Sequence, residues 1–288
     1  MSTGPTPRTP EAPSAGAAGV SEPIVRVTDL RKVFTGRHGR PDVAAVDGVS
    51  FTIGAGESLA VVGESGSGKT TAARMITGLE RPTSGTIEVA GRIRTPGHVS
   101  AAERRRRARE TQIVFQDPYG SLDPRQKVRD ALGEVLALHF RLSKTARNGR
   151  VAELLDQVGL DARIAGALPR EMSGGQRQRV AIAKALATRP SVLVLDEAVA
   201  ALDVSIQAQV LNLLADIRAA SGISFLFISH DLAVVRQVTD RAVVMRHGVI
   251  VEENTTADLL DDPRHPYTRL LRASVPGPGW TPRRRPAA

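Results

Sequence analysis

The strongest constraint on the fold is a strand, a glycine-rich turn and a helix that follow one another in SLAVVGESGSGKTTAARMITGL, residues 58–79. The turn matches the Walker A pattern G-x-x-x-x-G-K-[ST] at Gly63, Gly68, Lys69 and Thr70. Its glycines let the backbone wrap around a phosphate and point N–H groups at it, and the helix start adds partial positive charge. Lys69 places a full charge near the β and γ phosphates, and the Thr70 hydroxyl is a ligand for Mg²⁺.

The segment therefore predicts a site for a nucleoside triphosphate with Mg²⁺. The residues predicted to line it are Gly63, Glu64, Ser65, Gly66, Ser67, Gly68, Lys69, Thr70 and Thr71.

Short apolar runs alternate with helical stretches along the rest of the chain, which predicts a mostly parallel sheet with helices on both faces. No period of 20 to 50 residues repeats, which argues against a solenoid or a propeller. The strand-like runs are SLAVVG at 58–63, TQIVFQ at 111–116, SVLVLDE at 191–197 and SFLFISH at 224–230, and the clearest helical stretches are 70–79 and 207–220.

A pair of carboxylates follows the third of these strands, in SVLVLDEA at 191–198. In open parallel sheets, ligands bind at the carboxyl end of the strands. Asp196 is predicted to hold Mg²⁺ through water, as the aspartate of a Walker B motif does. Glu197 is then free to orient or deprotonate the attacking water. The apolar-Asp-Glu pattern is weak alone, but it gains weight because it follows a phosphate-binding loop in the right order.

A second glycine-rich helix start occurs in MSGGQRQRVAIAKAL, which begins at Met172. Ser173 and Gln176 fit a capping box, and capping alone is the simpler interpretation. Capping does not explain Gly174 and Gly175, because glycine weakens a helix by about 1 kcal/mol relative to alanine. Exposed N–H groups are what these glycines provide. Since the first loop already holds one triphosphate, this helix start can serve a phosphate bound by another chain, which predicts a head-to-tail dimer with two shared sites.

Composition limits the other possibilities. The 288 residues contain no cysteine, which excludes disulfides and thiolate metal sites. Much of the net charge of +9 lies in ERRRRAR at 103–109 and RRR at 283–285, which favours a solvated or partner-facing surface over specific nucleic-acid binding. Residues 1–22 and 277–288 are rich in Pro, Ser, Gly and Ala or Arg, so we expect a disordered tail at the N-terminus and a flexible basic tail at the C-terminus.

At these motifs the sequence resembles the nucleotide-binding subunits of ABC transporters, from about Val25 to Pro276. MSGGQ is similar to their signature motif, with Met172 where leucine is usual. The resemblance implies a P-loop NTPase fold of the ABC type: a mostly parallel core sheet, an antiparallel β part and a helical subdomain. It implies one ATP-binding domain over 23–276, with the helical subdomain at about 117–170. It also implies that the signature residues contact the γ phosphate bound by the opposite subunit; these are Ser173, Gly174, Gly175 and Gln176.

The resemblance gives roles to four further residues. Phe34 lies where the family places an aromatic residue that stacks on adenine, although a core position explains it nearly as well. Gln116 matches the Q-loop glutamine, which reaches Mg²⁺ and senses the membrane subunits. Asp203 matches the D-loop, and His230 matches the switch histidine that contacts the γ phosphate.

Three longer stretches of the sequence resemble the ATPase subunits of bacterial dipeptide and oligopeptide importers, and among them the second, F-type subunit. The matching stretches are VFQDPYGSLDPRQKV at 114–128, ALDVSIQAQVLNLL at 201–214 and HPYTRLLRASVP at 265–276. Some relatives carry cysteines for an iron-sulfur cluster near the C-terminus, and this chain has none. The resemblance implies an ATPase that uses ATP and Mg²⁺, pairs with a second copy or a sibling ATPase and with permeases, and lies peripherally on the cytoplasmic face of the membrane. It implies a solute-binding protein as an indirect partner and no nucleic acid. It favours dipeptides or oligopeptides as the solute, although relatives also carry nickel, glutathione and other small solutes.

Two alternatives remain at this stage. The first is a non-transport ABC ATPase that acts on the ribosome or DNA, although such proteins usually have two cassettes or a long inserted coiled coil. The second is a weakly hydrolysing ATP-binding partner in a heterodimer. It is kept because DEAVAALD has Ala198 and Ala200 where relatives commonly have proline and serine, whereas Glu197 and His230 argue against it.

Overall fold

The computed structural model describes residues 22–36, 41–94, 97 and 99–273. Apart from residue 22, both predicted tails lie outside the described residues. The strands are β1 Val25–Phe34, β2 Val43–Ile53, β3 Ser58–Val62, β4 Ser84–Val89, β5 Arg92–Ile93, β6 Thr111–Phe115, β7 Val192–Asp196, β8 Ser224–Ser229, β9 Arg241–Arg246 and β10 Val249–Thr255. The α-helices are α1 Lys69–Thr77, α2 Ala101–Glu110, α3 Val128–His139, α4 Lys144–Gln157, α5 Gly174–Leu186, α6 Val204–Ser221, α7 Leu232–Val238, α8 Thr256–Asp261 and α9 Pro266–Ala273. The short 3₁₀ helices are η1 Pro118–Ser121, η2 Ala162–Gly166 and η3 Pro169–Glu171.

The strands form two sheets. The larger has the order β10-β9-β3-β8-β7-β6, and all its neighbouring pairs are parallel except β10 with β9. The smaller is antiparallel, in the order β2-β1-β4-β5. The predicted fold class, a mostly parallel core sheet with an antiparallel part and helices, is confirmed.

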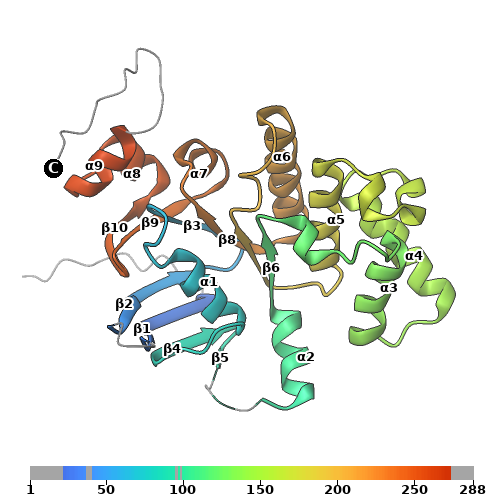
Figure 1. Ribbon diagram of the computed structural model, residues 1–288, viewed down its shortest axis with the longest axis horizontal. Helices are drawn as coiled ribbons and strands as arrows, with labels where there is room; N and C mark the ends of the chain where they lie inside the picture. Colours follow the sequence, from blue (N-terminus) through green and yellow to red (C-terminus); the bar gives the residue numbers. More distant parts are fainter. Residues whose placement is uncertain (1–21, 37–40, 95–96, 98, 274–288) are drawn as a thin grey trace, which may run out of the picture.

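The larger sheet is buried on both faces, as parallel sheets are. Along β7, Val192 and Val194 join the apolar cluster that contains α1 and the antiparallel sheet, whereas Leu193 and Leu195 join the cluster that contains α5 and α6. This alternation follows from the two-residue period of a strand. Helix α1 therefore lies between the two sheets, and it carries the end of the phosphate-binding loop into the centre of the molecule (Figure 1).

Helices α3 and α4 occupy one end of the molecule, and the antiparallel sheet with α8 and α9 occupies the other (Figure 1). Helices α3 and α4, together with η1, η2 and η3, make the predicted segment at 117–170 mainly helical. None of the helices among the described residues is long and apolar enough to cross a membrane.

The arginine-rich run at 103–109 forms most of α2, which has no buried residue. Ser100 caps the helix by accepting a hydrogen bond from the backbone N–H of Glu103. The Glu103 carboxylate accepts from Arg106 and Arg107, and Arg106 also reaches Glu110 at 2.8 Å. Arg106 and Arg107 are therefore paired along the helix itself, in the (i, i+3) and (i, i+4) positions that face each other.

Candidate active site

The predicted phosphate-binding loop leaves the fully buried strand β3 and enters α1 at Lys69. Gly63 and Gly68 have φ of 151° and 103°, where a side chain is strained. A Cβ at Gly63 would collide with the carbonyl oxygen of Met245 in β9, and one at Gly68 with that of Ala45 in β2. The loop can pass this close to both strands only with glycine at these two positions.

The start of α1 has no side-chain cap, because Gly68 is its N-cap residue and adopts the left-handed conformation. The first amides of a helix have no partner within the helix, so an anion can bind them. Glu64, Ser65 and Gly66 are exposed at the tip of the loop, whereas Ser67 is buried.

Lys69 is buried, and its ammonium group lies inside the loop. Its Nζ donates to the carbonyl oxygens of Gly63 at 2.8 Å and Glu64 at 2.7 Å. Burial lowers the pKa of Lys69, while the nearby carboxylates of Glu197 and Asp196 oppose that shift. The cation is therefore held by neutral oxygen atoms, which phosphate oxygens can replace with a gain in charge complementarity.

Asp196 ends β7 and faces the loop. The Thr70 hydroxyl donates to its Oδ1 at 3.0 Å, although the two residues are 126 positions apart. Burial raises the pKa of Asp196, and the hydrogen bond from Thr70 opposes the shift. A hydroxyl and a carboxylate side by side are hard oxygen donors, and Mg²⁺ is commonly bound by one or two such groups together with substrate phosphates. The residues present fit that ion.

Glu197 and His230 follow the neighbouring strands β7 and β8 and meet at their carboxyl ends. The His230 Nδ1 lies 3.2 Å from Glu197 Oε1. Glu197 has φ of 50°, an unusual value for a residue other than glycine, and its backbone N–H donates to Ile228 at 2.9 Å. The strand end therefore fixes the backbone at the residue predicted to handle the attacking water.

Gln116 directly follows β6 and is exposed. Because Phe115 of β6 is paired with Asp196 of β7, the carboxyl end of β6 lies beside that of β7. The parallel sheet thus brings Gln116, Glu197 and His230 to the same edge as the phosphate-binding loop.

The second helix start, at α5, is capped as predicted. The Ser173 hydroxyl accepts from the Gln176 N–H at 3.2 Å, and Gln176 Oε1 accepts from the Ser173 N–H at 2.9 Å. Ser173 and Gly174 are exposed. A Cβ at Gly175 would come within 2.5 Å of Ile206 Cγ2 in α6, which is a packing reason for that glycine that the sequence did not reveal.

Asp203 and Phe34 are also accessible. Asp203 is the N-cap residue of α6, but its side chain makes no capping hydrogen bond. Phe34 ends β1 and is 43% exposed, with the Lys32 ammonium 4.9 Å from its ring centroid. Phe34 is therefore not a core residue, which removes the alternative explanation of its position.

The segment with the two alanine substitutions keeps an ordered turn. The Ala200 N–H donates to the Glu197 carbonyl at 3.0 Å, and Ala198 is buried. The turn after Glu197 is therefore closed by a backbone hydrogen bond, with alanine at positions 198 and 200.

Sequence reasoning missed one contact of this site. The N–H of Glu64 donates to the hydroxyl of Tyr267 at 3.0 Å, across 203 positions. The HPYT stretch drew attention to Tyr267, but no local pattern connects it to the phosphate-binding loop.

Two family models match the chain. Residues 46–200 match a model described as ABC transporter, and residues 251–287 match one described as oligopeptide/dipeptide transporter, C-terminal region.

Among curated relatives, a Brucella abortus protein provisionally named a peptide import ATP-binding protein is 50% identical over 88% of this chain and 77% of its own length. An oligopeptide transport ATP-binding protein of Bacillus subtilis is 45% identical over 88% of this chain and 79% of its own. Among solved structures, a dimeric ATP-binding cassette bound to ADP and Pi superposes with a TM-score of 0.72 at 28% identity, over 81% of this chain and 98% of that one.

Proposed function

Because this chain belongs to the ABC transporter family, we propose that it binds and hydrolyses ATP to energise an importer of dipeptides or oligopeptides. The observation that carries the proposal is the gathering of Lys69, the Thr70–Asp196 pair and the Glu197–His230 pair at one edge of the sheet. The peptide assignment rests on the names of the relatives and on the match of residues 251–287 to the C-terminal region of oligopeptide/dipeptide transporters.

In the proposed reaction, the loop amides and Lys69 bind the β and γ phosphates. Thr70 and Asp196 would hold Mg²⁺, the latter through water, with Gln116 at the neighbouring strand end; the ion supplies charge neutralisation on the phosphate oxygens. The Glu197 carboxylate accepts a proton from the attacking water, and His230 restrains that carboxylate through its Nδ1. Phe34 offers an exposed ring to the adenine base.

The signature residues are proposed to act on the partner's nucleotide. The Ser173 oxygen accepts one hydrogen bond from its own helix, so its hydroxyl hydrogen remains free to be donated to a phosphate oxygen. Gly174 is exposed and brings no side chain between the helix amides and a ligand. We place Asp203 at the same dimer seam, and the dimeric state of a related cassette supports this arrangement.

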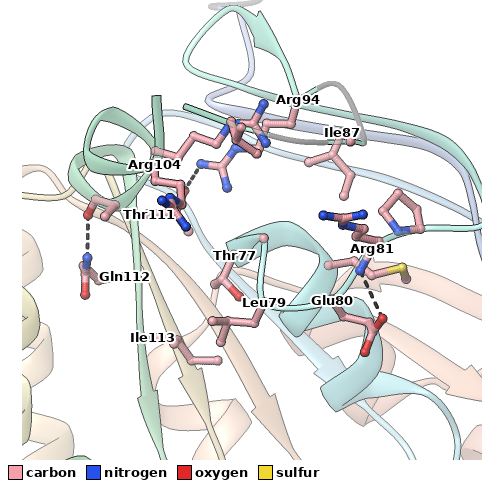
Figure 2. A pocket seen from close by; sticks show the side chains of 17 residues that line it. Thr77, Leu79, Glu80, Arg81, Ile87, Arg94, Arg104, Thr111, Gln112 and Ile113 are labelled. Carbon is pink, nitrogen blue, oxygen red and sulfur yellow. Dashed lines mark hydrogen bonds between the residues drawn. The ribbon is translucent and has the colours of Figure 1, made fainter. Parts of the chain in front are cut away.

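The membrane partner is proposed to be a permease that docks on the helical segment at 117–170, as expected from the sequence, and on a second surface formed by α1, α2 and β6. A hollow of about 380 Å³ lies among α1, α2 and β6, lined by apolar Leu79 and Ile113 and by basic Arg81 and Arg104 (Figure 2). Its occupant would be a cytoplasmic permease segment with apolar and acidic side chains. Strand β6 begins at this hollow and ends next to Gln116. A segment docked in the hollow would therefore contact one end of a strand whose other end lies at the nucleotide site. We therefore propose that the chain lies peripherally on the cytoplasmic face of the membrane.

Single-cysteine crosslinking tests the docking proposal, because the chain has no cysteine of its own. Leu79→Cys should crosslink to a permease in membranes that hold the active complex. Leu270→Cys on α9 is the matched control, since the two leucines are 59% and 58% exposed. Equal crosslinking from both positions, or none from Leu79→Cys in an active complex, would contradict docking at the hollow.

Two measurements test the function itself. The purified chain should bind ATP and hydrolyse it with Mg²⁺, and cells without it should lose uptake of labelled dipeptides or oligopeptides. If the chain hydrolyses ATP but cells without it take up peptides normally, the proposed ATPase activity stands and the proposed peptide substrate is wrong. Retention of the Glu197–His230 pair supports hydrolysis over the alternative of a weakly hydrolysing partner.

A further inference from the structure

The C-terminal helix α9 makes a direct contact with the phosphate-binding loop. The hydroxyl of Tyr267, in the first turn of α9, accepts a hydrogen bond from the N–H of Glu64 at 3.0 Å. Tyr267 is only 4% exposed, so water competes little for this bond. An element near the end of the described chain therefore holds the backbone at the start of the loop.

This contact lies on the same peptide unit that holds Lys69. The carbonyl of Gly63 and the N–H of Glu64 belong to one peptide group, and that carbonyl accepts from Lys69 Nζ at 2.8 Å. A hydrogen bond at one end of a peptide polarises the group and strengthens the bond at its other end. The Tyr267 hydroxyl thus fixes the plane of the peptide that positions the ammonium group.

The tyrosine is itself held from several sides. The Arg246 guanidinium, at the end of β9, lies 4.9 Å from the centroid of the Tyr267 ring. The backbone N–H of Tyr267 donates to His265 Nδ1 at 3.1 Å. The Glu252 carboxylate in β10 accepts from the backbone N–H groups of Arg264 at 2.8 Å and His265 at 3.0 Å, and so ties the turn before α9 to the sheet. Figure 1 shows α9 at the β9–β10 end of the sheet.

We propose that Tyr267 is a positioning residue for the nucleotide: its hydroxyl holds the Gly63–Glu64 peptide in the orientation that Lys69 and the phosphates require. The proposal rests on the proposed function, since it assumes that the loop binds a nucleotide. It gives the C-terminal region a role at the nucleotide site, because α9, tied to the sheet through Glu252, preorganises the loop before the ligand arrives. Preorganisation of this kind raises affinity by lowering the cost of ordering the loop.

Tyr267→Phe in the full chain is the direct test, since it keeps the ring and its packing and removes only the hydroxyl. We expect the affinity for MgADP, measured by calorimetry, to fall about threefold to tenfold. The KM for ATP should rise by a similar factor while kcat stays near the wild-type value, because Glu197 and His230 are not touched. If the hydroxyl has only a structural role, its loss should lower thermal stability and change neither KM nor kcat.

Thr255→Ala is the matched control. It also removes one hydroxyl that accepts from a backbone amide in the C-terminal region, that of Asp258 at 3.2 Å, but at the start of α8. It should lower the melting temperature and leave the affinity for MgADP unchanged.

Hydrogen exchange supplies an independent readout. Because linkage is reciprocal, MgADP should slow amide exchange in α9 of the wild-type protein, and this protection should shrink in Tyr267→Phe. Wild-type affinity for MgADP in Tyr267→Phe, with wild-type protection of α9, would overturn the positioning role alone. Failure of the wild-type protein to bind MgADP would overturn the proposed function, and this inference with it.

Discussion

Two glycine-rich helix starts lie in the part of the chain that the structure describes, and they are built differently. The first, at α1, lies between two sheets, has the left-handed Gly68 as its N-cap without a side-chain cap, and contains the Lys69 cation. The second, at α5, is exposed and is closed by the Ser173 capping box. Glycines at the first are required by the carbonyls of neighbouring strands, whereas Gly175 at the second is required by the packing of α6.

The difference indicates that the two helix starts have different roles in phosphate binding. An uncapped helix start with an enclosed cation can bind a phosphate without help from another chain. A capped start has already used one of its N–H groups, and Arg177 in the first turn of α5 donates through Nε to the carbonyl oxygen of Pro169 at 2.6 Å. We infer that α1 binds the nucleotide and that α5 responds to a phosphate delivered by a partner. The four predictions below try to break that inference, from the largest effect to the smallest.

The largest effect should come from Glu197→Gln, which leaves both helix starts intact. The amide keeps the shape of the side chain and loses the base, so turnover should fall about 10²-fold to 10⁴-fold. ATP binding should persist, and the variant should accumulate as an ATP-bound dimer on gel filtration. Turnover at the wild-type rate would show that the helix starts suffice and that Glu197 is not the base.

The second prediction separates the two starts by complementation. Lys69→Ala damages the first and Ser173→Arg crowds the second, and each variant alone should be inactive. A mixed homodimer carries both lesions in one shared site and none in the other, so an equal mixture should recover about a quarter of the wild-type activity. For a native heterodimer, one lesion is placed in each subunit.

ATP binding distinguishes the two lesions in the same experiment. Lys69→Ala should lose affinity for ATP, whereas Ser173→Arg should keep its first binding of ATP and fail to close the dimer. Full ATPase activity of Ser173→Arg alone would exclude a role for α5 at the partner's nucleotide. Unchanged ATP affinity in Lys69→Ala would contradict the proposal that the first loop binds the phosphates of ATP.

The third prediction compares glycines directly. Gly68→Ala should lower the free energy of unfolding by about 1–3 kcal/mol, because alanine is strained at φ of 103° and its Cβ meets the Ala45 carbonyl. Gly174→Ala should cost less than about 1 kcal/mol, because its Cβ would lie 3.8 Å from Leu202 Cδ2, an ordinary contact. Urea unfolding measures both. Equal losses at the two positions would mean that the two starts do not differ in backbone constraint.

The sequence predicted the parallel sheet well. The runs at 58–63, 111–116, 191–197 and 224–230 became β3, β6, β7 and β8, each within one residue at either end. Buried parallel strands are continuous apolar runs, so their limits are written in the sequence. The residues at the ends of these strands were identified for the same reason.

The antiparallel sheet could not be read from residue patterns in the same way. Strand β1 alternates irregularly between buried and exposed residues, and its pairing with β2 and β4 is interrupted by register shifts. The antiparallel sheet was expected only from the resemblance to the ABC transporter subunits. The contacts of Gly175 with Ile206 and of Glu64 with Tyr267 depend on how distant elements pack, which no local pattern carries.

The smallest predicted effect comes from Ser173→Ala, and it is the most specific. This change removes an N-cap, which should cost about 1 kcal/mol of stability. Ser143→Ala is a closely matched control: Ser143 caps α4 by accepting from the Ala146 N–H at 3.2 Å, the same distance as in the Ser173 cap. The two variants should therefore lose similar free energy of unfolding. If Ser173 also donates its hydroxyl to the partner's γ phosphate, only Ser173→Ala should lower ATPase activity, by about threefold to tenfold, because one hydrogen bond is lost across the dimer. Equal ATPase activity in the two variants would reduce Ser173 to a cap and leave the second helix start without a role for its hydroxyl.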